Sequence, residues 1–204
     1  MTPPPPDGAF GELPVIGAPR ERADAAANRK RILEAALRVL AEHGADGASI
    51  DTIAQEAGVG KGTIFRRFGD RSGLFQALID EDLRRFQDEF MFGPPPLGPG
   101  APPADRLVAF FEGLIDVQES RLELMLALER DRWKSPMGGY VTLSLHVERL
   151  VAELSPALDA PVTAQLLLNA VNPLLLRYLR REVGVDLATI KDSMRSLIVG
   201  LPAA

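Results

Sequence analysis

"VGKGTIFRRF", residues 59–68, combines glycines, three positive charges and three large apolar side chains in one short segment. Successive residues of an α-helix are rotated by about 100°, so Ile64 and Phe68 fall on one side of a helix here. Gly62, Thr63 and Arg66 fall on the opposite side, with Phe65 and Arg67 on the flanks. The segment therefore predicts a short helix that buries one face and presents positive charge on the other.

A second short helix is predicted directly before this segment. Ser49 can cap it through its hydroxyl, Asp51 suits the positive end of the helix dipole, and Gly58 ends it in a tight turn. Two short helices joined by such a turn form a helix-turn-helix, in which the second helix lies in the major groove of DNA. The sequence therefore predicts a DNA-binding motif over residues 49–68.

The chemistry of the second helix fits this role. Gly62 lets the backbone approach DNA, and the free N–H groups at the helix start can bind a phosphate. Arg66 can reach a guanine edge, and Thr63 can touch a thymine methyl or a hydrogen-bond acceptor. Taken alone, a charged cluster on a short helix is most often a solvated face, so the prediction depends on the joint pattern.

Positive charge is concentrated in this part of the chain. Residues 20–71 hold 10 Lys and Arg against 8 Asp and Glu, whereas residues 72–204 hold 13 against 18. The whole chain carries a net charge of −5. A basic patch on an acidic body suits a protein that touches DNA with one face.

Composition excludes several other classes of site. The 204 residues include no cysteine, which excludes disulfides, thiolate metal sites and a cysteine nucleophile. Only His43 and His146 are present, so we expect no metal site and no cofactor. The chain has no apolar run of about 18 residues and its start lacks a secretion signal, so we expect no membrane span and a cytoplasmic location.

The remaining pattern predicts an all-α fold of about nine helices in three parts. Residues 1–20 are rich in proline and glycine and predict a disordered tail, residues 21–70 a DNA-binding domain, and residues 71–204 a helical effector-binding and dimerisation domain. The first helix is expected from about Asp24 to Gly44, and the fourth from Arg71 or Ser72 to Phe92. Later helical segments are expected at 104–120, 122–133, 140–154, 163–182 (bent at Pro173) and 186–201. Residues 93–103 are expected to form a loop.

The residues 49–78, "SIDTIAQEAGVGKGTIFRRFGDRSGLFQAL", resemble the tetracycline-repressor (TetR) family of bacterial transcriptional regulators. The Ala-Gly-Val turn, the Lys-Gly-Thr helix start and the Leu74-Phe75 pair stand at the family's spacing. The resemblance covers about residues 27–80 and implies a homodimer that binds palindromic double-stranded operator DNA. It also implies a helical C-terminal domain that binds a small-molecule effector and dimerises.

Carried over by residue, the resemblance implies a set of DNA contacts. Ser49 caps its helix at a phosphate, and Arg67 and Arg71 stand where the family often has a histidine and a lysine. Two positions depart from the family: Phe65 replaces a tyrosine whose hydroxyl binds phosphate, and Gly60 replaces a capping serine. The predicted DNA-binding residues are Ser49, Gly60, Lys61, Gly62, Thr63, Arg66, Arg67 and Arg71.

The C-terminal part predicts two further functions. Residues 166–179 and 194–201 are too apolar to face water, which fits either burial within one subunit or, as we favour, a dimer interface through these last two helices. The middle helices are expected to line a site for an apolar or aromatic effector, which acts on the DNA-binding helices through the fourth helix. The candidate residues are Phe110, Phe111, Leu114, Met125, Trp133, Met137, Tyr140, Leu143 and His146.

Two other classes of function stay open. The basic helix could bind DNA without sequence choice, although the acidic C-terminal part disfavours this because nonspecific binding depends on neutralising many phosphates. An enzyme could use His146 together with Arg149. Since the sequence has no phosphate loop, nucleophile motif or metal spacing, we expect no enzymatic activity.

Overall fold

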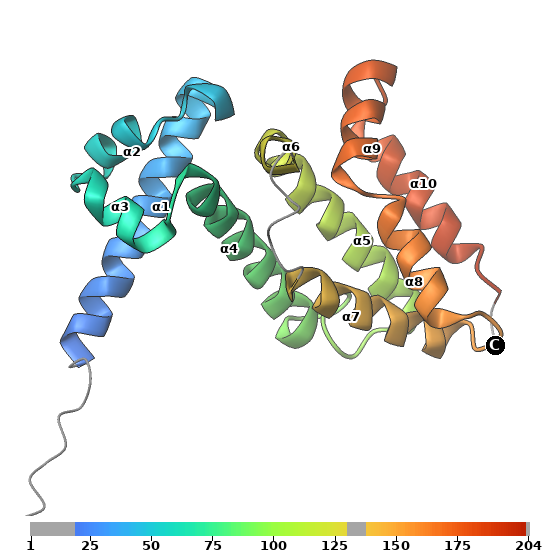
Figure 1. Ribbon diagram of the computed structural model, residues 1–204. Coiled ribbons are helices and arrows are strands. Elements are labelled where there is room, and N and C mark those ends of the chain that lie inside the picture. Colours follow the sequence, from blue (N-terminus) through green and yellow to red (C-terminus); the bar gives the residue numbers. More distant parts are fainter. Residues whose placement is uncertain (1–18, 130–137, 203–204) are drawn as a thin grey trace, which may run out of the picture.

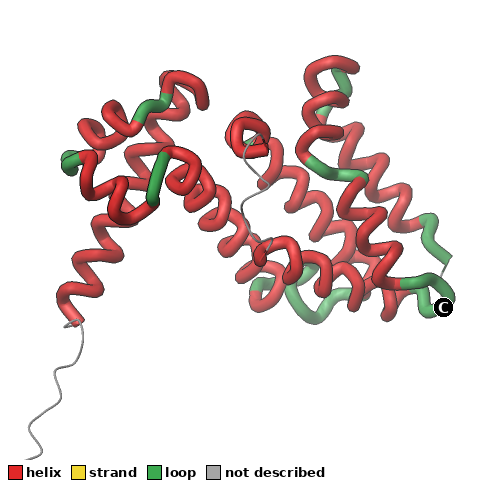
Figure 2. The backbone as a smooth tube through the Cα atoms, in the orientation of Figure 1, coloured by secondary structure: helices red, strands yellow, loops and turns green. Residues whose placement is uncertain are grey.

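The computed structural model describes residues 19–129 and 138–202. Within these ranges the chain forms helices joined by loops, and it contains no strand (Figures 1 and 2). The predicted all-α class is confirmed. Most of the predicted tail, residues 1–18, lies outside the described residues. No helix of the described ranges is long and apolar enough to cross a membrane.

Four helices make up the N-terminal part (Figure 1). They are α1 (Pro19–Gly47), α2 (Ile50–Ala57), α3 (Lys61–Phe68) and α4 (Arg71–Phe92). The first helix begins at Pro19 rather than near Asp24. Its regular geometry breaks at Gly44, whose φ of 67° lies in the left-handed region that glycine adopts without steric cost.

Local signals account for the limits of α2, α3 and α4. The Ser49 hydroxyl accepts a hydrogen bond from the Thr52 N–H at 3.1 Å, and Gly58 ends α2 with a φ of 62°. The Asp70 carboxylate accepts from the Gly73 N–H at 2.7 Å and so caps α4. No side chain caps α3 at Gly60, so its first N–H groups stay available to a ligand.

The buried side chains of these helices form the N-terminal core, built around Ile32, Ile53, Ile64, Leu74 and Phe75. Each of these five side chains is 0–2% exposed. The apolar stripes of α1, α2 and α3 meet here on the first turns of α4. This packing fixes the orientation of α3 relative to α1 and α4.

The C-terminal part is also helical. It consists of α5 (Pro103–Ser120), α6 (Leu122–Glu129), α7 (Gly138–Leu154), α8 (Ala160–Asn169), α9 (Pro173–Arg177), the π-helix η2 (Tyr178–Val183) and α10 (Leu187–Val199). The expected bend at Pro173 is an interruption of the helix. The chain leaves α8 at Asn169, and Asn172 caps α9 by accepting from the Leu175 N–H at 2.9 Å. Pro173 takes the first helical position, where its missing N–H has no cost.

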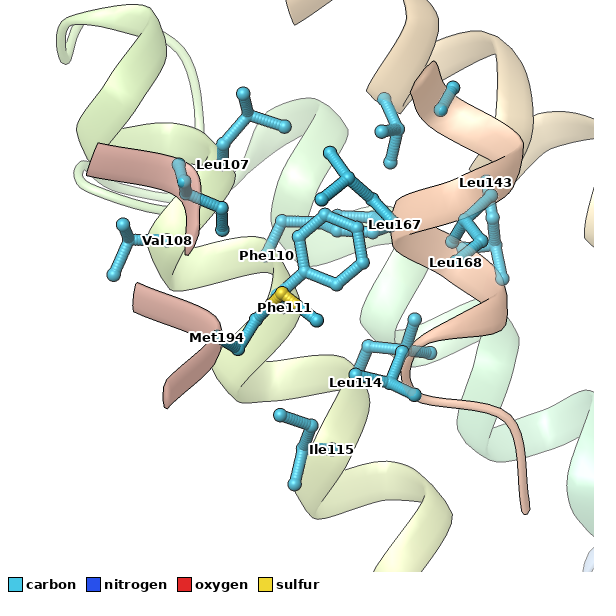
Figure 3. Close-up of a cluster of buried hydrophobic side chains, with 14 of the residues drawn as sticks. Leu107, Val108, Phe110, Phe111, Leu114, Ile115, Leu143, Leu167, Leu168 and Met194 are labelled. Carbon is cyan, nitrogen blue, oxygen red and sulfur yellow. The ribbon is translucent and has the colours of Figure 1, made fainter. Parts of the chain in front are cut away.

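A second buried cluster, the C-terminal core, is built around Phe86, Phe90, Phe110, Phe111 and Leu150. Its side chains come from each α-helix from α4 to α10, and Figure 3 shows part of it between α5 and α8. The helix α4 contributes its first turns to the N-terminal core and its last turns to the C-terminal core. Any movement of α4 therefore affects both parts of the protein.

Candidate nucleic-acid interface

The helix α3 has one buried face and one open face. Ile64 is fully buried and Phe68 packs against the N-terminal core, whereas Gly62 and Arg66 are exposed. A Cβ atom built at Gly62 would meet nothing within 4 Å. The fold itself therefore does not require glycine at this position, and the bare backbone is open to a molecule outside the protein.

Lys61 forms an ion pair with a residue of α2. Its Nζ lies 2.5 Å from Oδ2 of Asp51, and both side chains are more than half exposed. An exposed ion pair contributes about 0–1 kcal/mol, so a phosphate can compete for the lysine at little cost. Asp51 thus holds Lys61 near the start of α3.

Arg67 has a partner that the sequence pattern did not indicate. Its Nη1 donates a hydrogen bond to the carbonyl of Ala25 in α1, and its side chain is half-buried. In addition, the Arg29 guanidinium lies 5.2 Å from the centre of the Phe68 ring. Both contacts tie α3 to the N-terminal half of α1. Arg67 therefore positions α3, and its predicted contact with a phosphate stays a prediction.

Arg71 is also engaged within the protein. Its Nε donates to the carbonyl of Ala48 at 2.9 Å, and its Nη2 donates to the carbonyl of Ala45. The guanidinium also lies 4.7 Å from the centre of the Phe75 ring. These hydrogen bonds satisfy one carbonyl in the last turn of α1 and one between α1 and α2, so Arg71 stabilises the start of the helix-turn-helix. Its predicted role toward DNA is untested.

The other predicted DNA-binding residues lie around the start of α2 and α3. Ser49 and Gly60 are exposed at the two helix starts, and Thr63 is half-buried beside Gly62. The Ser49 hydroxyl also lies 2.8 Å from the Thr52 hydroxyl, so it is hydrogen-bonded within the first turn of α2. The structure thus brings Gly60, Lys61, Gly62 and Arg66 to one exposed surface.

The predicted effector residues separate into different places. Phe110, Phe111, Leu114 and Leu143 are buried in the C-terminal core (Figure 3). Met125 packs against the N-terminal core instead, together with its neighbour Leu124. Trp133 and Met137 lie outside the described residues, as does the side chain of Tyr140. Met125 is therefore separated from the predicted group.

His146 is the polar side chain within this aromatic cluster. Its ring centre lies 4.3 Å from that of Phe90 and 5.2 Å from that of Phe110. Its Nε2 is buried and has no hydrogen-bond partner among the described residues. Burial, followed by the nearby charges of Arg106 and Arg149, lowers the pKa of His146 to about 4 against the opposing effect of Glu153. The imidazole is therefore neutral at pH 7.

This environment predicts a pH-dependent stability. The unfolded chain binds a proton at His146 below its ordinary pKa of 6.5, and the folded chain does so only below about 4. The contribution of neutral His146 to the free energy of unfolding is thus fully present above pH 6.5 and is lost as the pH falls toward 4. Because of His146, we expect the free energy of unfolding to be about 2 kcal/mol lower at pH 5 than at pH 7.

Urea unfolding at pH 7 and pH 5 measures this loss. In His146→Phe the loss attributed to His146 should be absent, whereas His43→Gln should keep it because His43 lies on the exposed surface of α1. An equal acid loss in the native chain and in His146→Phe would contradict the assignment.

Comparison with known proteins adds independent information on the N-terminal part. The family model of bacterial regulatory proteins, tetR family, matches residues 32–78, which include α2, α3 and the first turns of α4. An HTH-type transcriptional regulator of Staphylococcus aureus is 42% identical over 69 residues, covering 34% of this chain and 37% of that protein. The HTH-type transcriptional repressor AcnR of Corynebacterium glutamicum is 43% identical over 61 residues, covering 30% and 32%. The match thus spans about a third of these relatives.

Solved structures share the fold over most of the chain. A transcriptional regulator from Rhodococcus sp. Rha1 superposes with a TM-score of 0.65 at 22% identity, covering 84% of this chain and 94% of that chain. The regulator FadR of Bacillus subtilis, solved in complex with stearoyl-CoA, superposes with a TM-score of 0.57 at 17% identity, covering 84% and 97%. Residues 32–78 of this chain thus match the DNA-binding domain of the TetR family, and the chain shares its overall fold with these solved transcriptional regulators.

Proposed function

We propose that this protein is a transcriptional repressor that binds a palindromic operator as a homodimer and is released by a small apolar or aromatic effector. The observation that carries the proposal is the open face of α3, where Gly62 and Arg66 stand opposite the buried Ile64. The match of the DNA-binding domain to a repressor, AcnR, supports repression rather than activation.

The face of α3 has the properties of a recognition helix. The uncapped helix start offers N–H donors, Lys61 offers a charge held by a weak ion pair, and Arg66 offers two donors suited to a guanine edge. Phosphate contacts position a protein on DNA, while base contacts specify the sequence. The first two features serve positioning and the third serves specificity.

Footprinting on the DNA that flanks the protein's own gene tests this function. Excess random DNA is included, because a sequence-specific regulator keeps its operator under this competition. Protection of one palindromic segment is expected. Protection that vanishes with the competitor would favour the alternative of a nonspecific architectural protein, and no binding at all would leave an enzyme that uses His146 as the candidate.

Dimerisation is proposed through α8 and α10. Val162 and Leu166 lie four residues apart on α8 and are 55% and 67% exposed, and Leu197 on α10 is 57% exposed. Burial of such apolar side chains against a second copy of the chain would stabilise a dimer. The interior position of Leu168, which is only 4% exposed, excludes it from this surface, and Leu175 at 36% is marginal.

The effector site is proposed in the C-terminal core around His146. Binding sites for small molecules are mostly apolar with a few polar groups that fix orientation, and an unpartnered imidazole nitrogen among aromatic rings meets this description. That FadR was solved with stearoyl-CoA is consistent with an apolar effector for this fold.

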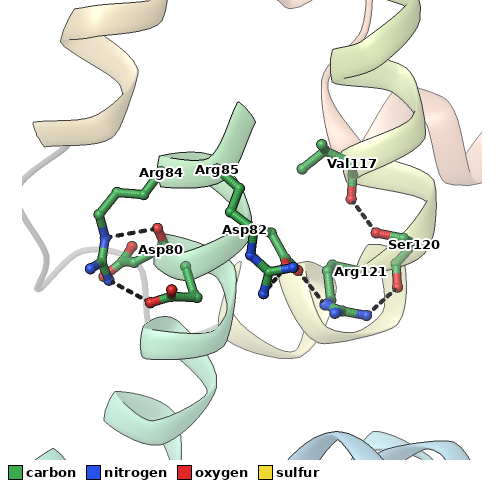
Figure 4. A network of polar contacts seen from close by, with 8 residues as sticks. Asp80, Asp82, Arg84, Arg85, Val117, Ser120 and Arg121 are labelled. Atoms are coloured by element: carbon green, nitrogen blue, oxygen red, sulfur yellow. Dashed lines mark hydrogen bonds and ion pairs between the residues drawn. The ribbon is translucent and has the colours of Figure 1, made fainter. Parts of the chain in front are cut away.

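The path from this site to DNA is proposed through α4 and α6. Leu124 on α6 is 4% exposed and packs into the N-terminal core, although it follows α5 of the C-terminal part. Directly before α6, the Nε of Arg121 lies 2.7 Å from Oδ2 of Asp82 on α4 (Figure 4). These two contacts link α4 and α6, so a shift at one helix is passed to the other.

This link predicts reciprocal coupling between the two ligands. Allosteric coupling is commonly about 1–3 kcal/mol, and operator DNA must weaken effector binding by the same factor by which the effector weakens operator binding. Titration of an identified effector with and without operator measures this. We expect Leu124→Ala to reduce the coupling free energy. If the native protein binds the effector with the same affinity in the presence and absence of operator, the proposed coupling is contradicted.

A further inference from the structure

Phe65 is the large apolar side chain of α3 that the fold leaves open. It is 49% exposed, while Ile64 is fully buried and Phe68 packs against the N-terminal core. Phe65 is not one of the buried residues that make up this core. Among the described rings, Arg29 covers Phe68 and Arg71 covers Phe75, but no cation or ring is found over Phe65. Stability therefore gives little reason for a phenylalanine here.

The ring has open space on the side that faces DNA. In a helix, aromatic side chains point back toward the N-terminus and lie over the residues three and four positions earlier. For Phe65 these residues are Gly62 and Lys61. Nothing lies within 4 Å of a Cβ atom built at Gly62, so the ring has room over the first turn of α3. The first turn of a recognition helix is the part that reaches the base edges.

The chemistry of the ring restricts what it can recognise. Phenylalanine has no hydrogen-bond donor or acceptor, so it gains nothing from a phosphate or from the polar edge of a base. The apolar group that bases present in the major groove is the 5-methyl group of thymine, which phenylalanine is known to contact in protein–DNA complexes. Thr63 is half-buried and offers less apolar surface.

Phe65 is also adjacent in sequence to Arg66, the residue proposed to bind a guanine edge. Gly62, Phe65 and Arg66 occupy positions i, i+3 and i+4, which are neighbours on a helix surface. Phe65 and Arg66 thus lie on either side of Gly62, where one side chain can make an apolar contact and the other hydrogen bonds with nearby bases.

We propose that Phe65 is a specificity-determining residue that reads the 5-methyl group of a pyrimidine, a thymine in the natural operator, beside the base read by Arg66. The inference rests on the proposed DNA-binding function. It assigns to the protein a second element of base recognition that does not depend on charge.

Replacement of single thymines by deoxyuridine in the operator tests the inference, because only the methyl group is removed. Affinities are measured for the native chain and for Phe65→Ala, with Phe92→Ala, which removes an exposed ring from α4, as the matched variant. One thymine in each half-site should be sensitive in the native chain, with a loss of about fourfold per half-site for one buried methyl group. Phe65→Ala should bind the thymine operator more weakly and should not distinguish thymine from deoxyuridine, whereas Phe92→Ala should keep both the affinity and the distinction.

A second arm separates the two sources of the methyl group. If the contacted pyrimidine is a cytosine, 5-methylcytosine at that position should strengthen binding of the native chain but not of Phe65→Ala. That result would support recognition of a 5-methyl group by Phe65, but it would identify the contacted base as cytosine rather than thymine.

Insensitivity of the native chain to every such change, or the same sensitivity in Phe65→Ala, would overturn the inference while leaving operator binding in place. Failure of the native chain to bind any specific DNA would overturn the proposed function, and the inference with it. A thermal midpoint of unfolding that is the same in Phe65→Ala as in the native chain would show that the exposed ring is not needed for folding.

Discussion

Leu166→Glu combined with Leu197→Glu is expected to convert the proposed dimer into monomers that no longer bind the operator. Both side chains are more than half exposed in the single subunit, so the substitutions should leave its fold intact. In the dimer each glutamate would be an unpaired charge in apolar surroundings, which costs about 3–5 kcal/mol. Analytical ultracentrifugation at micromolar concentration measures the change in mass.

A matched control is available on another helix. Phe92 on α4 is 79% exposed, and Phe92→Glu introduces one such charge away from α8 and α10. The control should sediment as a dimer. A monomeric native chain, or a double variant that remains dimeric, would contradict the proposed interface. Leu168→Glu is a different case, since a charge at this buried position is expected to unfold the subunit.

Arg66→Ala and Arg67→Ala are expected to differ, although both remove one arginine from the same helix. Arg66 is exposed opposite Ile64, so its loss should cost about 1–3 kcal/mol per half-site and relax base preference at one position of each half-site. Arg67 is half-buried and bonded to Ala25, so its loss should weaken binding to all sequences about equally.

Titrations with the operator, with single-base variants and at several salt concentrations separate the two arginines. If Arg67 also contacts a phosphate, Arg67→Ala should flatten the salt dependence by about one unit per half-site. If Arg67 only positions α3, Arg67→Ala should lower the thermal midpoint of unfolding and leave the salt dependence of operator binding unchanged. A change of base preference in Arg67→Ala, with only a salt effect in Arg66→Ala, would mean that α3 is rotated relative to this account.

Local sequence signals were sufficient for the helix-turn-helix. The Ser49 cap, the left-handed Gly58 and the apolar positions Ile53 and Ile64 are each encoded within a few residues, and the structure confirms the limits of α2 and α3. Such signals are reliable because capping and helical periodicity act over one or two turns.

Contacts between distant segments could not be predicted in this way. Arg67 bonds to a residue 42 positions earlier, and nothing in the sequence around position 67 indicates which carbonyl is near. Leu124 packs into the N-terminal core because α6 folds back on α1 and α4, which a local apolar pattern does not reveal.

The apolar helix α8 shows a related difficulty. Residues 166–168 are all leucine, and periodicity cannot separate the face that packs inward from the face that stays open when both are apolar. In the structure Leu167 and Leu168 are buried, while Leu166 is 67% exposed. Only the packing of α8 on α7 and the C-terminal core decides which leucine is available to a partner.

Selection from a random pool of double-stranded DNA is the most direct test of the central claim that α3 reads DNA as part of a dimer. The native chain should enrich a palindrome whose half-site centres are separated by about 10 base pairs or a multiple of this, as for other dimeric helix-turn-helix proteins. Arg66→Ala should enrich the same spacing with one position in each half-site degenerate. Enrichment of no common sequence by the native chain, or an unchanged palindrome with Arg66→Ala, would contradict the account.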